Sequence, residues 1–146
     1  MSNLVCNDCG TCCINVSAPR HVEPHSSCCY CGERVEVKIA PNQVIKAGTI
    51  IGELTDMPMT YKAFDPLATD GTQYARVILE WDVCTDEAGR IKNWSGLWGC
   101  GPNTTQAYLC GKFSLRDIND GDTGIINAAR ASGMPIRIVN NIVYIG

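Results

Sequence analysis

Cysteine is distributed very unevenly along this chain of 146 residues, and this constrains the fold more than any other feature. Seven of the ten cysteines lie within the first 31 residues. So short a segment buries too little apolar surface to be stable alone, so a bound metal or disulfides must hold it together. We therefore expect a Cys-rich N-terminal arm over residues 1–38 and a separate β domain over residues 39–146.

Two units of the form Cys-x-x-Cys-Gly stand in the arm, at residues 6–10 and 28–32. Such a turn brings two thiolates onto one metal ion, and two turns complete a tetrahedron. The spacing between the units is typical of a four-cysteine zinc site. Four thiolates leave no open position, so the zinc would be structural. The arm is thus predicted to be zinc-ribbon-like, with the metal ligands Cys6, Cys9, Cys28 and Cys31.

Disulfides are the alternative to zinc in the arm. The chain begins Met1-Ser2-Asn3, without the basic and apolar regions of an export signal, and a reducing compartment favours metal binding. Further ligands or disulfide partners are available at Cys12, Cys13, Cys29, His21 and His25. Because Pro24 separates the two histidines, we expect them in solvent-exposed loops. The later cysteines, Cys84, Cys100 and Cys110, are expected to be buried thiols, with a Cys100–Cys110 bridge left open.

Charge and motifs argue against nucleic-acid binding and against catalysis. Twelve basic residues face 15 acidic ones, for a net charge of -3, so there is no bulk positive charge for nucleic acid. No apolar run is long enough to span a membrane. The chain has no phosphate loop and no hydrolase or metalloprotease motif, so we expect no enzyme. We interpret the acidic residues Glu80, Asp82, Asp86 and Glu87 as solvated turn charges, the alternative being a divalent-cation site.

Beyond the arm, the sequence predicts a mainly β (α+β) fold. Apolar alternation with period two predicts strands, and Gly, Pro, Asp and Asn mark the turns between them. Asn140-Asn141 suits a two-residue hairpin turn. The segment from Cys84 to Pro102 is long and Gly-rich, and its Trp94 and Trp98 fit either an interface or local packing. Strands are predicted at 34–39, 49–54, 61–64, 74–81, 107–113, 136–139 and 142–145, and one helix at 124–132.

Three consecutive pieces of the sequence together resemble a known family. They are KAGTIIGELT at 46–55, YKAFDPLATDGTQ at 61–73 and VILEWDV at 77–83. In this order and spacing they resemble the lambda-type bacteriophage head decoration proteins, over about residues 40–139. The Cys-rich segment before residue 34, the insertion around 90–102 and the final hairpin depart from the family pattern.

The resemblance implies a small β-barrel or β-tulip-like decoration domain with one short C-terminal helix and no catalysis. It implies homotrimers that bind the major capsid protein on the outer surface of a tailed-phage head and stabilise the expanded shell. The protein would be made in the host cytoplasm, reside in the virion, and bind neither nucleic acid nor membrane. The alternative is a zinc-ribbon-containing binding module of a cellular protein.

Overall fold

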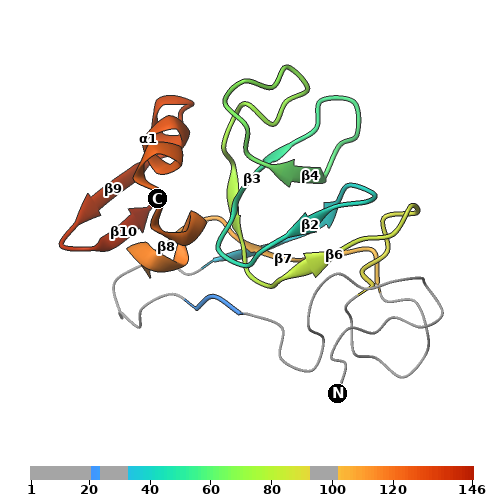
Figure 1. The fold of residues 1–146 in the computed structure, drawn as a ribbon, viewed down its shortest axis with the longest axis horizontal. Helices are drawn as coiled ribbons and strands as arrows, with labels where there is room; N and C mark the ends of the chain where they lie inside the picture. Colours follow the sequence, from blue (N-terminus) through green and yellow to red (C-terminus); the bar gives the residue numbers. More distant parts are fainter. Residues whose placement is uncertain (1–20, 24–32, 93–101) are drawn as a thin grey trace.

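The computed structural model describes residues 21–23, 33–92 and 102–146, and Figure 1 shows their arrangement. Five strands close into a barrel in the order β1-β4-β3-β5-β7. β1 pairs with β4 in parallel, whereas the other neighbours are antiparallel. The strands are β1 (Arg34–Ile39), β3 (Ile50–Glu53), β4 (Thr60–Ala63), β5 (Val77–Leu79) and β7 (Thr105–Tyr108).

β1 shows why the barrel forms where it does. Its Val37 and Ile39 are buried and Val35 packs against the same core, while Arg34, Glu36 and Lys38 are exposed, as the alternating sequence predicts. Because β1 begins at Arg34, residues 34–38 of the predicted arm belong to the barrel. The barrel interior is filled by aliphatic side chains: Val37, Ile39, Ile45, Ile51, Val77, Leu79, Val83, Ile91 and Ala107.

A second, three-stranded sheet has the order β8-β10-β9, from β8 (Gly111–Ser114), β9 (Ile136–Val139) and β10 (Ile142–Ile145). The predicted hairpin is confirmed: Asn140 and Asn141 join β9 to β10 with φ of 51° and 64°. Asparagine tolerates this left-handed region, so the turn matches the twist of its strands.

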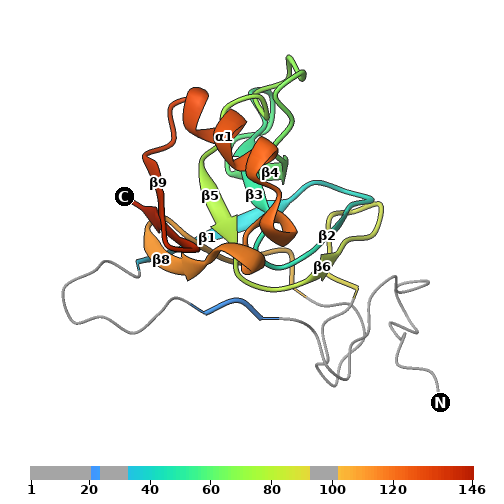
Figure 2. The same cartoon turned by 60° about the vertical axis from the view of Figure 1, so that its left-hand side comes forward.

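Helix α1 (Thr123–Ala131) lies within one residue of its predicted bounds. Asp122 caps it by accepting hydrogen bonds from the backbone N–H groups of Gly124 and Ile125. The buried face of α1 packs on both sheets (Figure 2), where it joins the second core cluster. This cluster consists of Val22, Ala47, Ile50, Phe64, Ala75, Ile78, Tyr108, Phe113, Ile118, Ile126, Ala129, Met134, Ile136, Val143 and Ile145.

The mainly β class with one short helix is confirmed, but two predicted strands were wrong in extent. The strand predicted at 107–113 is two strands, because the chain bends at Leu109 and passes from the barrel into the second sheet. The strand predicted at 74–81 shortens to β5, because the residues before it belong to the preceding turn. The pair β2 (Val44–Ile45) and β6 (Val83–Cys84) escaped prediction, because two residues show no period.

Short 3-10 helices, η1 (Leu115–Asp117) and η2 (Asn119–Gly121), connect β8 to α1. In the described parts of the chain, no helix is both long and apolar enough to cross a membrane.

Candidate functional site

Three residues of the N-terminal segment, His21–Glu23, lie along the side of the barrel, and we call them the strap. Val22 is only 2% exposed and belongs to the second core cluster. Both polar groups of its backbone are hydrogen-bonded. The Val22 N–H donates to the Glu80 carbonyl at 2.9 Å, and the Tyr108 hydroxyl donates to the Val22 carbonyl at 2.9 Å. The strap is therefore part of the folded domain.

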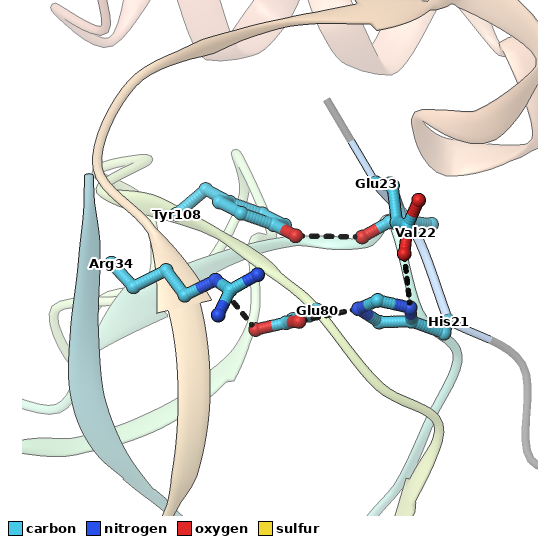
Figure 3. Close-up of polar contacts among 6 residues, drawn as sticks. All are labelled: His21, Val22, Glu23, Arg34, Glu80 and Tyr108. Atoms are coloured by element: carbon cyan, nitrogen blue, oxygen red, sulfur yellow. Dashed lines mark hydrogen bonds and ion pairs between the residues drawn. The ribbon is translucent and has the colours of Figure 1, made fainter. Parts of the chain in front are cut away.

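The buried carboxylate of Glu80 lies between the strap and β1 (Figure 3). Its side chain is 3% exposed. Oε2 contacts Nε2 of His21, and Oε1 faces Nε of Arg34 at 3.3 Å, an ion pair outside hydrogen-bond geometry. A buried charge requires such partners, because desolvation costs several kcal/mol per ion. Glu80 thus ties the strap to the barrel, through its hydrogen bond with His21 and its ion pair with Arg34.

His21 does not lie in a solvent-exposed loop, and that prediction was wrong. Its side chain is 22% exposed, and its ring stacks on Trp81 at 4.1 Å between centroids, with an interplanar angle of 17°. Its Nδ1 lies 3.4 Å from Oε1 of Glu23, so both ring nitrogens face carboxylates. Metal ligation through either nitrogen would require breaking one of these contacts.

Arg34 and Tyr108 form one polar cluster with Glu80 and His21 (Figure 3). The guanidinium lies over the phenol ring at 5.5 Å. The hydrogen bond to Tyr108, and then the charge of Glu80, raise the pKa of Arg34. Burial raises the pKa of Tyr108 above its ordinary value. The stability from this protonated phenol is therefore present below about pH 10 and is lost as the pH rises through the folded-state pKa.

Each polar group of this cluster is used to hold the strap, so its arrangement fits a structural role. The Tyr108 hydroxyl is committed to the Val22 carbonyl and the histidine to carboxylates. Within residues 21–23, 33–92 and 102–146, no three side chains of the His, Cys, Asp or Glu type are grouped so as to hold a metal ion.

The acidic residues after β5 differ from one another in environment. Glu80 is buried, so its interpretation as a solvated charge was wrong. It directly follows β5, whose three residues are all buried, and no local alternation in the sequence distinguishes it from an exposed turn residue. Asp82 accepts a hydrogen bond from Ala47 N–H at 2.8 Å. Asp86 accepts from two amides of its own turn, and Glu87 is exposed, as expected of turn charges.

The cysteines of the described residues also differ from one another in environment. Cys84 is a buried thiol, as predicted. Cys110 is disulfide-bonded, so its prediction as a thiol was wrong. The four predicted zinc ligands lie outside the described residues, and zinc binding stays a prediction. Seven further residues named in the sequence analysis also lie outside the described residues: Cys12, Cys13, His25, Cys29, Trp94, Trp98 and Cys100.

The turn that carries much of the family resemblance is tightly bonded. Asp65 N–H donates to the Thr72 carbonyl at 3.0 Å, and Asp70 Oδ1 accepts from the Thr72 hydroxyl at 2.6 Å and from its N–H at 3.1 Å. Gly71 has φ of +108°, and a Cβ there would lie 2.3 Å from the Glu53 carbonyl, so only glycine fits. At the tip of this turn, Leu67 is 90% exposed.

Comparison of the chain with known protein families, with curated proteins and with solved structures finds no match in any of the three. The function proposed below therefore rests on the sequence motifs and the geometry of this chain.

Removing the Tyr108 hydroxyl should loosen the strap. We expect Tyr108→Phe to lower the free energy of unfolding by about 1–3 kcal/mol, because the Val22 carbonyl loses its donor while still buried. Urea unfolding followed by circular dichroism measures this. The matched control is Tyr74→Phe on a half-exposed ring, which should change stability by less than about 0.5 kcal/mol. Equal effects of the two substitutions would contradict the strap's dependence on Tyr108.

Thr72 controls the titration of Asp70. Its hydroxyl and then its amide lower the pKa of Asp70. The stability this gives is present above the ordinary pKa of aspartate, about 4, and is lost as the pH falls through the folded-state pKa. Thr72→Val should raise the pKa of Asp70 in an NMR titration. It should also destabilise the protein at pH 7 more than in acid, whereas Thr69→Val on the exposed neighbour should do neither.

Proposed function

We propose that this chain is a structural capsid decoration protein of a tailed bacteriophage, without catalytic activity. The observation that carries the proposal is that the pieces of sequence resembling the lambda-type family form one continuous unit. β3, β4 and β5 come from these pieces, and β3 pairs with both of the others. The bonded turn joins β4 to β5, and the Thr55 N–H binds it to the end of β3 through the Asp70 carbonyl at 2.8 Å.

The physical demands of the role agree with this architecture. A cement protein needs rigid surfaces that contact several capsid subunits, not a reaction site. Weak contacts, multiplied in a homotrimer, give high avidity. A protein that binds the assembled shell and not its free subunits stabilises the shell by mass action. The partners are then the major capsid protein and further copies of this chain, and the location is the outer surface of the head.

We propose a structural zinc ion for the arm, on Cys6, Cys9, Cys28 and Cys31, with disulfides as the alternative. The spacing of the two Cys-x-x-Cys-Gly units supports this, as does the position of the strap between them in the sequence. Val22 is anchored in the core, so the connection between the two units is tied to the barrel.

Native mass spectrometry with and without a chelator tests the metal. We expect the purified chain to carry one zinc ion that the chelator removes. A mass that the chelator leaves unchanged, and that is short by more than the two hydrogens lost in the disulfide of Cys110, would instead assign the arm's cysteines to disulfides.

Binding to heads tests the function. Purified protein should sediment with expanded heads assembled from the major capsid protein of the same phage, in multiples of three copies. It should also raise the temperature at which those heads disrupt. Unexpanded heads are the control and should bind little, because the proposed sites arise on expansion.

Failure to bind expanded heads would overturn the proposal. In that case a salt-dependent mobility shift with nucleic acid would favour the alternative, a zinc-ribbon-containing binding module of a cellular protein.

A further inference from the structure

The outer face of the three-stranded sheet carries a row of two cations and an aromatic ring. Lys112, Tyr144 and Arg137 are directly opposite one another in the strand register. The Arg137 guanidinium lies 4.6 Å from the centre of the Tyr144 ring, and the Lys112 ammonium lies 5.9 Å from it. The next row, on the same face, is Ser114, Ile142 and Val139. We call these six residues, none of which is acidic, the basic face.

This face is suited to bind carboxylates. Because the Tyr144 ring holds the guanidinium in place, Arg137 loses little freedom when its N–H groups pair with an acid. The same contact covers the ring, which makes it a poor platform for stacking a nucleic-acid base. A hollow of about 430 Å³ adjoins the face, lined by Ser114, Leu115, Arg116, Ile142 and the hairpin asparagines, and also by Gly121 and one acidic residue, Asp120. An apolar side chain of a partner could occupy it.

Two loops elsewhere in the same chain carry aspartates and exposed apolar side chains. The β3–β4 loop and the β4–β5 loop lie side by side, bonded between Thr55 N–H and the Asp70 carbonyl. Their exposed side chains include three aspartates, the polar Thr55 and Thr69, and one basic residue, Arg76. Three apolar side chains are exposed beside them, Leu67 at 90%, Met59 at 56% and Met57 at 45%. We call this surface the acidic tip: Asp56, Met57, Met59, Asp65, Leu67 and Asp70.

The two surfaces lie apart on the molecule. In Figure 1 the loops of the acidic tip project at the top, beyond β3 and β4, whereas β8, β9 and β10 lie at the left. One copy therefore does not satisfy its own basic face with its own acidic tip. Two different surfaces that complement each other make a head-to-tail contact between copies, and such contacts close into a ring when the rotation permits.

We propose that the basic face binds the acidic tip of a second copy of this chain. Arg137 and Lys112 pair with the aspartates of the neighbour, and Leu67 enters the hollow beside Ile142. The number of copies in the ring, three, rests on the proposed function. The pairing of the two surfaces does not, because it follows from their charge and shape.

Two variants, each breaking one surface, test the pairing. The first is Lys112→Glu with Arg137→Glu, and the second is Asp56→Asn with Leu67→Ser. The wild type should be oligomeric in sedimentation equilibrium, and each variant alone should be monomeric, with association weakened about tenfold or more. An equimolar mixture of the two variants should form a dimer and nothing larger, because it restores one intact pair of surfaces.

The matched control is Arg90→Glu, which reverses one exposed charge in the loop after β6 and should leave the oligomer intact. Circular dichroism of each variant checks that it folds. A wild type that stays monomeric at high micromolar concentration overturns the pairing. So does an oligomer that survives in either variant, or a mixture that fails to associate.

The head-binding experiment separates this inference from the proposed function. A monomer that still binds expanded heads overturns the pairing of surfaces but supports the proposed decoration function. A ring that does not bind expanded heads supports the pairing and overturns the decoration function. A monomer whose basic face binds poly-glutamate or oligo-dT would assign that face to an acidic protein or to nucleic acid, and the second copy would again be wrong.

Discussion

The buried carboxylate of Glu80 is the interaction on which the join between the N-terminal segment and the barrel depends. It compensates the charge of Arg34 on β1 and holds His21 of the strap. In so doing it keeps Val22 against Tyr108, where Val22 completes the second core cluster. A single charged group therefore links three segments that are far apart in the sequence. Removing Arg34 or His21 would leave the buried carboxylate of Glu80 with one partner fewer, which is costly.

A second constraint acts at the other end of the barrel. The turn from Asp65 to Thr72 closes on itself through hydrogen bonds and is bound to the end of β3. Its conformation is therefore set by its own side chains. Such a turn presents Leu67 in one orientation, which lowers the entropy lost when the loop binds a partner. Rigid presentation of an apolar tip agrees with the proposed function, in which the protein holds capsid subunits together.

Local chemistry predicted the elements whose signals lie within a few residues. The alternation in β1, the Asn140-Asn141 turn and the period of helix α1 each depend on neighbours in sequence. Glu80 and His21 were misjudged for the opposite reason. A glutamate is normally exposed, and only the approach of Arg34 and the strap makes its burial tolerable. The division of residues 107–113 between β7 and β8 likewise depends on tertiary pairing, because β7 pairs within the barrel and β8 within the three-stranded sheet.

The sequence by itself determined the mainly β class, the hairpin, the single helix and the turn chemistry of residues 65–72, because backbone propensity and period are local properties. Only the tertiary structure decided which five strands close the barrel that the family resemblance implied, that Val22 is a core residue, and that basic and acidic surfaces lie on separate parts of the molecule. These features depend on which distant segments meet, and contact between distant segments leaves no periodic trace in the chain.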